Sequence, residues 1–151
     1  MKRFTWRLQK VLDVKTMEEQ VRRAELLKLT EKLVQTQGTL LMEKRILEDM
    51  MSDIAEKAPR KRVGAQELFL KYSKTSDELI AKLEHEVRHL ELQQKEKIAA
   101  VLKLRRFKEG LEKLRAETKK EFISNQEKLE QKQADERCTI RMVRELQKAR
   151  S

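Results

Sequence analysis

One group of side chains in this chain matches a catalytic motif. The run His85-Glu86-Val87-Arg88-His89 has the pattern H-E-x-x-H. On a helix the two histidines lie one turn apart, where both can bind zinc, and the glutamate can act as a general base. A zinc protease also needs a third ligand and a cleft that excludes water, and the chain contains no further histidine. With no phosphate-binding loop and no nucleophile beside a base, the sequence predicts a protein that is not an enzyme and has no metal or other cofactor.

The same motif lies inside a long heptad pattern, in which Val87 is one of the regularly spaced positions. Such a period, near 3.5 residues, keeps one stripe of a helix facing a partner helix. Polar residues at stripe positions weaken the pairing and set its register. The first stripe consists of Leu26, Leu33, Leu40, Leu47 and Ile54, with polar positions at Thr30, Gln37 and Lys44. The second consists of Ile80, Leu83, Val87, Leu90, Gln94, Lys97, Val101, Leu104, Lys108 and Leu111.

A break between the two stripes predicts how the helices are arranged. Pro59 and Gly64 lie between them, and a proline ends the helix before it. The sequence therefore predicts an all-α fold, a long antiparallel two-helix coiled-coil hairpin. The predicted bounds are one coiled-coil domain over 1–151, a first helix over about 5–58, a turn over about 59–64 and a second helix over about 65–149.

The second predicted helix is longer than the first. At 1.5 Å per residue the two span roughly 80 Å and roughly 110–130 Å, so the second helix overhangs. Its regular stripe fades after Leu111 and Leu114, and residues from about Thr118 onward are expected to lack a partner within the chain over much of their length. The run Thr75-Ser76-Asp77-Glu78 is a capping box, which leaves a later start or a kink at that point open.

Composition points to acidic partners. The chain of 151 residues has 36 Lys and Arg against 26 Asp and Glu, a net charge of +10. Such a surplus suits nucleic acid, anionic lipid or an acidic protein surface. The surplus is concentrated at both ends and at Arg60, Lys61 and Arg62 in the predicted turn. The single cysteine, Cys138, excludes an intrachain disulfide and fits a reducing cytosol. No run is apolar enough for a signal peptide or a membrane span, so we expect a cytoplasmic protein.

The few aromatic residues lie near the two ends of the predicted hairpin. Phe69 and Tyr72 follow the turn, and Phe4 and Trp6 lie near the amino terminus. Each pair either covers the end of the stripe or forms an exposed anchor for a partner. Aromatic side chains that stack on bases would have to alternate with the basic clusters, and here they do not. Nucleic-acid binding is therefore the weaker alternative.

Two strings resemble a known family. The segment Phe4-Thr5-Trp6-Arg7-Leu8-Gln9-Lys10-Val11-Leu12 resembles the opening of the FliJ family of bacterial flagellar export proteins, with Trp6 where phenylalanine is more usual. The segment Glu130-Gln131-Lys132-Gln133-Ala134-Asp135-Glu136 is similar to the carboxy-terminal part of that family, in which Gln-Lys is followed shortly by Asp-Glu. Length, basicity and the predicted hairpin match as well.

The resemblance implies a set of partners. Members of the family are hairpins similar to the central stalk of rotary ATPases. The end that carries both termini lies in the hexameric export ATPase, the part near the turn contacts the cytosolic domain of the export gate, and the protein handles export chaperones. The location implied is the cytoplasm, peripherally at the inner face of the cell membrane. The resemblance implies that the gate is bound by Phe69 and Tyr72. It implies that the ATPase is bound by Phe4, Trp6, Arg7, Gln131, Lys132, Asp135, Glu136, Arg137, Arg141 and Arg144.

Two alternatives stay open beside this function. One is the equivalent stalk protein of a virulence-type secretion system, which has the same shape. The other is a basic coiled coil that binds nucleic acid or a membrane surface, because the net charge is +10.

Overall fold

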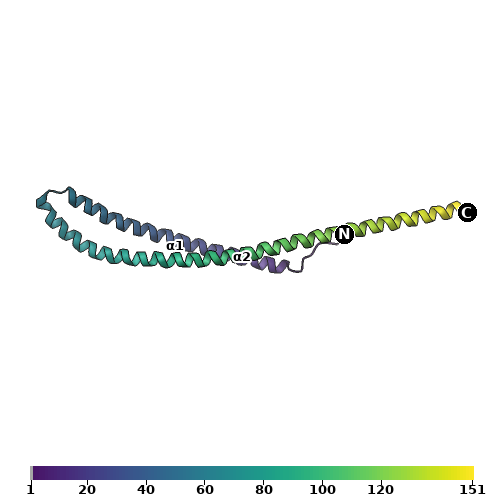
Figure 1. Ribbon diagram of the computed structural model, residues 1–151, viewed down its shortest axis with the longest axis horizontal. Helices are drawn as coiled ribbons and strands as arrows, with labels where there is room; N and C mark the ends of the chain where they lie inside the picture. Colours follow the sequence, from purple (N-terminus) through teal and green to yellow (C-terminus); the bar gives the residue numbers. More distant parts are fainter. Residues whose placement is uncertain (1) are drawn as a thin grey trace. The chain divides into compact units, whose positions relative to one another are not determined.

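Two long helices make up nearly all of the chain in the computed structural model, which describes residues 2–151 (Figure 1). Helix α1 runs over Gln9–Glu56 and helix α2 over Pro59–Arg150. At 1.5 Å per residue they are roughly 72 Å and roughly 138 Å long. No strand occurs in the part of the chain described. The predicted all-α helical hairpin is confirmed.

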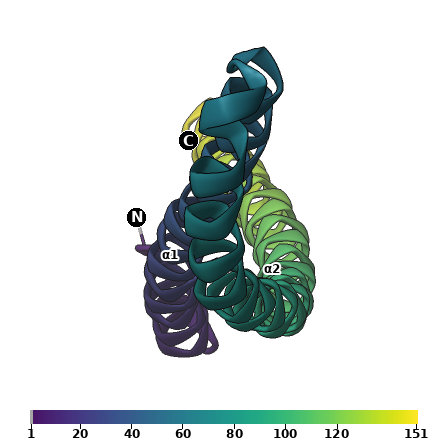
Figure 2. The same ribbon diagram turned by 90° about the vertical axis from the view of Figure 1, so that its left-hand side faces the viewer.

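The chain divides into two compact units. The hairpin unit is Glu18–Leu104, and the end unit combines the amino-terminal residues through Met17 with Arg105–Ser151. In the hairpin unit α1 and α2 lie side by side (Figures 1 and 2). They are antiparallel, because Lys44 near the end of α1 pairs with Glu84 while Glu25, earlier on α1, pairs with Lys97. That residues 1–151 form a single coiled-coil domain stays a prediction.

The heptad stripes form the seam between the helices. The five apolar α1 positions and all ten α2 positions predicted from the sequence are buried or half-buried. Of the predicted polar α1 positions Thr30 is half-buried, whereas Gln37 and Lys44 are exposed, so their assignment to the seam is wrong. In the hairpin unit Leu33, Val87 and Leu90 form the core, with exposed fractions of 5%, 9% and 4%, and Leu29 and Leu40 pack against them. Because a two-helix seam is narrow, each helix keeps most of its surface in water, which explains why 41% of the residues are charged.

The turn is shorter than the sequence predicts. Lys57 and Ala58 alone connect α1 to α2. Pro59 is the first residue of α2, so the predicted turn at 59–64 is wrong. Proline suits the first helical position for two reasons. An N–H at that position would have no acceptor within the helix, so its absence costs nothing, and the φ of proline is already helical. The Arg62 side chain completes the turn: its Nε donates to the Lys57 carbonyl at 2.8 Å, and its Nη2 donates to a carbonyl at the end of α1.

The capping box does not start or kink a helix. Residues 75–78 lie in the interior of α2. Ser76 is only 4% exposed, and its hydroxyl donates to Glu43 Oε2 across the seam at 3.3 Å. A small hydroxyl residue that sits in the seam and one that caps a helix look alike in sequence, and here the seam decides the role of Ser76.

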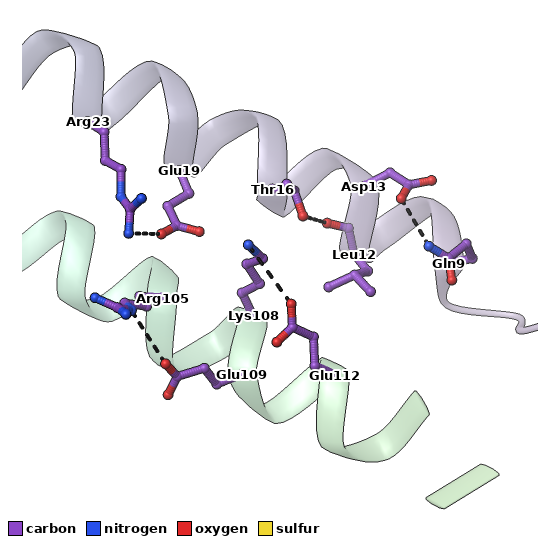
Figure 3. Close-up of polar contacts among 10 residues, drawn as sticks. All are labelled: Gln9, Leu12, Asp13, Thr16, Glu19, Arg23, Arg105, Lys108, Glu109 and Glu112. Carbon is purple, nitrogen blue, oxygen red and sulfur yellow. Dashed lines mark hydrogen bonds and ion pairs between the residues drawn. The ribbon is translucent and has the colours of Figure 1, made fainter. Parts of the chain in front are cut away.

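The start of α1 also differs from the sequence prediction. The helix begins at Gln9, not near residue 5. Seven residues before Leu26, the inward-facing position is Glu19. Its side chain is 5% exposed and forms an ion pair with Arg23 at 3.0 Å (Figure 3). Seven residues earlier still, Leu12 is 8% exposed and continues the buried stripe, whereas Val14, Met17 and Val21 lie outside, at 53%, 69% and 57% exposed.

Neither helix has a stretch that is long and apolar enough to cross a membrane, over the residues that the structure describes.

Candidate functional site

The amino-terminal residues of the end unit pack onto α2. The Phe4 ring lies 5.5 Å from the Phe122 ring, centre to centre, with the planes tilted by 53°. The Arg115 guanidinium lies over the Phe4 ring, 6.0 Å from its centroid, and Arg115 Nε donates to Gln9 Oε1 at 2.9 Å. Gln9 in turn donates to Asp13 at 3.0 Å (Figure 3). An aromatic pair of this geometry contributes roughly 0.5–1.5 kcal/mol beyond its burial.

These contacts give the predicted amino-terminal site residues different roles. Phe4 is half-buried and holds the segment before α1 against α2. Trp6 is half-buried too, and its carbonyl accepts from the Gln9 N–H at 3.2 Å, next to the start of α1. Arg7 is exposed. Of the three, Arg7 is therefore the one whose side chain is free to meet a partner without unpacking the end unit.

The partnered part of α2 extends further than the sequence predicts. Residues 2–8 cover α2 past Thr118, and Lys2 lines an open groove together with Phe122, Gln126 and Glu130. Beyond Gln126 no residue of the end unit is even half-buried, so residues 127–151 form the exposed end of the chain. After Thr118 only Phe122 and Gln126 are half-buried, so the fully exposed part of α2 starts at Glu127.

All seven carboxy-terminal site residues lie on this exposed stretch. They divide between two sides of α2, because each residue turns the helix by about 100°. Arg137, Arg141, Arg144 and Lys148 fall within an arc of about 60°, and we call them the basic stripe. The other four predicted residues lie away from it, on a different part of the helix surface: Gln131, Lys132, Asp135 and Glu136.

An apolar patch borders the basic stripe, because Ile140 lies one helical turn before Arg144, about 40° from it around the helix. Ile140 and Val143 are 53% and 48% exposed, and Ile140 lines an open groove with Lys132, Asp135 and Glu136. These apolar residues were not among the predicted site residues. Their spacing on a helix, next to Glu136, is the signal that could have identified them.

The amino-terminal and carboxy-terminal site residues do not form one cluster. Phe4 lies at Phe122, whereas Gln131 is the first of the carboxy-terminal residues, more than two helical turns further along α2. Within the end unit the candidate site is therefore the exposed helix 127–150. Phe4 packs on Phe122, just before this exposed helix begins.

Near the turn, Phe69 and Tyr72 differ in exposure. Phe69 is half-buried and lies in the seam register, seven residues before Ser76. Tyr72 is 38% exposed and lines an open groove with Glu43, Ser76 and Leu79. Of the two, Tyr72 presents its side chain to a partner, and Phe69 supports the packing beneath it.

The histidines of the H-E-x-x-H run lie on the outside of α2. Both rings are exposed, and His89 Nε2 lies 3.2 Å from Gln93 Nε2. Val87 between them is a core residue. Among residues 2–151 no group of three or more His, Cys, Asp or Glu side chains is placed to hold a metal ion.

Comparison with known proteins identifies a family. The family model described as the flagellar FliJ protein matches residues 3–147, nearly the whole chain. No curated protein and no solved structure matches the chain significantly. A family match over this length, on a chain that folds as a two-helix hairpin, shows that the chain belongs to the FliJ family of flagellar proteins, which serve flagellar protein export.

Proposed function

We propose that this chain is a non-enzymatic, stalk-like subunit of the flagellar type III export apparatus. It acts in the cytoplasm at the inner face of the cell membrane, links the hexameric export ATPase to the cytosolic domain of the export gate, and handles export chaperones. The observation that carries the proposal is the exposed helix 127–150, which carries a basic stripe and, bordering it, an apolar patch.

An isolated helix of this length and polarity is marginal in water, so it gains most when a partner surrounds it. A ring encloses a rod on all sides. Ile140 and Val143 would meet apolar ring residues, while Arg137, Arg141 and Arg144 would meet acidic ones. The two kinds of contact differ in their response to salt, because only the charged pairs are screened.

Truncation tests this proposal. Deleting residues 127–151 removes the exposed helix and leaves Phe122 and the packing of Phe4 in place. We expect the shortened chain to stay helical and to lose ATPase binding and any stimulation of ATP hydrolysis, measured by pull-down and by phosphate release. A truncated chain that binds and stimulates as the full chain does would contradict the proposal.

Charge reversal refines the test. Changing Arg137, Arg141 and Arg144 to glutamate should weaken ATPase binding, more at low salt than at high salt. The matched control changes Lys28, Lys32 and Lys95, three exposed lysines of the hairpin unit, to glutamate and alters the net charge equally. Equal weakening in both variants would mean that net charge, not the basic stripe, governs binding.

The basic stripe also favours a second candidate function, binding to nucleic acid. Four cations on one helical face can follow a line of phosphates. Such binding would fall steeply between low and physiological salt and would be lost on reversal of the stripe, without any need for Ile140 or Val143. Duplex DNA retention measured across a salt series, with Ile140→Ala and Val143→Ala beside the charge variant, separates the two functions.

A further inference from the structure

A second stripe with heptad spacing runs along the exposed side of α1 in the hairpin unit. Three of its members are large and apolar, and their exposed fractions are 61% for Leu27, 59% for Val34 and 67% for Leu41. In a two-helix hairpin such outer positions are ordinarily polar, so apolar residues that keep register there indicate a further helical contact. The stripe alternates steps of four and three residues and consists of Leu27, Glu31, Val34, Gly38, Leu41 and Arg45.

No contact within the chain explains why the middle of this stripe is a glycine, Gly38. Glycine destabilises a helix interior relative to alanine. A Cβ built at Gly38 would meet nothing within 4 Å, so no neighbour in the chain requires a glycine there. On an exposed stripe the missing side chain allows the backbone of another helix to come close.

The charges of the stripe are arranged symmetrically about that glycine. Glu31 lies seven residues before Gly38, and Arg45 lies seven residues after it. Both are exposed, and neither forms an ion pair within the described chain. A helix with this arrangement is complementary to itself when reversed: Glu31 of each copy comes level with Arg45 of the other. A parallel pairing in register would place glutamate against glutamate and arginine against arginine.

From these features we infer that the exposed side of α1 binds a second copy of this chain, antiparallel and centred on Gly38. A two-fold axis through the glycine produces the Glu31–Arg45 contact twice. The same alignment brings Val34 level with Met42 of the second copy, and Met42 is 66% exposed. The contact covers about four helical turns, and a surface this small fits a weak, concentration-dependent dimer. The inference does not depend on the proposed export function.

The test measures self-association of the full chain by sedimentation equilibrium over a concentration series. We expect a monomer–dimer equilibrium. Glu31→Arg and Arg45→Glu should each weaken dimerisation by about tenfold or more, because each places like charges together twice. The double variant Glu31→Arg with Arg45→Glu restores both contacts and should return the dissociation constant to within about threefold of the starting value.

Matched controls lie elsewhere on the hairpin unit. Glu86→Arg changes an exposed glutamate of α2, and Lys32→Glu changes an exposed residue on a different side of α1. Both should leave the dissociation constant unchanged. If these controls weaken the dimer as much as the stripe variants do, net charge is the cause and the inference is overturned.

The glycine supplies an independent test. Gly38→Leu fills the point of closest approach and should abolish the dimer while helicity by circular dichroism is kept or raised. Gly110→Leu is the control, since a Cβ at Gly110 also meets nothing within 4 Å. A chain that stays monomeric at every concentration overturns the inference. So does a double charge variant that remains as weak as the single ones, because only the antiparallel self-pairing predicts rescue.

Discussion

Gln94 of α2 donates a hydrogen bond from its Nε2 to Thr30 Oγ1 of α1 at 3.2 Å, inside the seam of the hairpin unit. The same hydroxyl donates to the Leu26 carbonyl at 2.8 Å. A polar pair in an apolar seam favours one alignment of the helices, because a shift of register takes the half-buried Gln94 amide away from its acceptor on Thr30. This pair thus contributes more to the alignment of the hairpin than to its stability.

The first prediction follows from that pair. Replacing Thr30 by valine and Gln94 by leucine together should raise the free energy of unfolding by about 1 kcal/mol, because both polar groups disappear and apolar area is buried. Gln94→Leu alone should gain less, since Thr30 then loses one partner. Urea unfolding followed by circular dichroism measures the natural chain and both variants. A double variant that is less stable than the natural chain would show that the hydrogen bond itself stabilises the fold.

The second prediction concerns the turn. Arg62 Nη2 donates to the Ala55 carbonyl at 3.0 Å, and Nε donates to Lys57, so the side chain satisfies carbonyls at the end of α1. Arg62→Ala should lower the free energy of unfolding by about 1 kcal/mol. Arg62→Lys should recover only part of this, because one ammonium does not match a planar guanidinium at two carbonyls.

Arg60 is the control for this turn. It is exposed and carries no hydrogen bond or ion pair in the part of the chain described, so Arg60→Ala should change stability by less than about 0.5 kcal/mol. Equal losses for Arg60 and Arg62 would mean that the charge of the basic run matters and not the carbonyl contacts.

The third prediction concerns the amino-terminal segment. Phe4→Ala or Phe122→Ala should release residues 2–8 from α2, because the two rings hold that segment. Limited proteolysis should then cut before Gln9 faster than in the natural chain. In a double-mutant cycle the two changes should show a coupling of about 0.5–1.5 kcal/mol. Leu129→Ala, at a residue that is 52% exposed and lies outside the groove that Lys2 lines, serves as the control and should leave the proteolysis rate unchanged.

The seam was predictable from sequence because periodicity is information shared by many residues. Each of the ten α2 positions from Ile80 to Leu111 contributes to one register, so a polar member such as Gln94 or Lys97 does not obscure it. Helix ends lack this redundancy. Pro59 both ends one helix and suits the first position of the next, and only the tertiary arrangement of Lys57 and Ala58 decides where the turn lies.

The candidate site was predictable only in part, for a related reason. Gln131, Lys132, Asp135 and Glu136 were found through a resemblance to a family, the three arginines after them through their charge, and all seven are exposed as a binding site requires. Phe4 was selected by the same resemblance, but its partner Phe122 lies more than a hundred residues away in the chain, and no local pattern announces that contact. Likewise Phe69 and Tyr72 are three residues apart. Only their different burial in the folded helix shows that Phe69 packs in the seam and that Tyr72 is exposed to a partner.

The fourth prediction uses that difference. Tyr72→Ala should weaken binding to the cytosolic domain of the export gate and change the free energy of unfolding by less than about 0.5 kcal/mol. Phe69→Ala should lower the free energy of unfolding by about 1–3 kcal/mol, because a half-buried ring is lost from the seam register. Calorimetric titration of the gate domain and urea unfolding measure the two effects. Unchanged gate binding in the Tyr72 variant would remove this residue from the proposed site.

The last prediction concerns the dynamics of the exposed helix. Residues 127–150 bury no side chain, so nothing but their own hydrogen bonds holds them helical, and isolated helices are marginal in water. Their amides should exchange with solvent much faster than those around Leu33, Val87 and Leu90, whose opening requires the core to separate. Hydrogen exchange read by mass spectrometry compares the two regions in one sample. Adding the export ATPase should then slow exchange in 127–150 while leaving the Leu33 region unchanged. If the free helix is already protected as strongly as the seam, it is stabilised by something other than a bound partner, and the argument that it gains order from an enclosing ring fails.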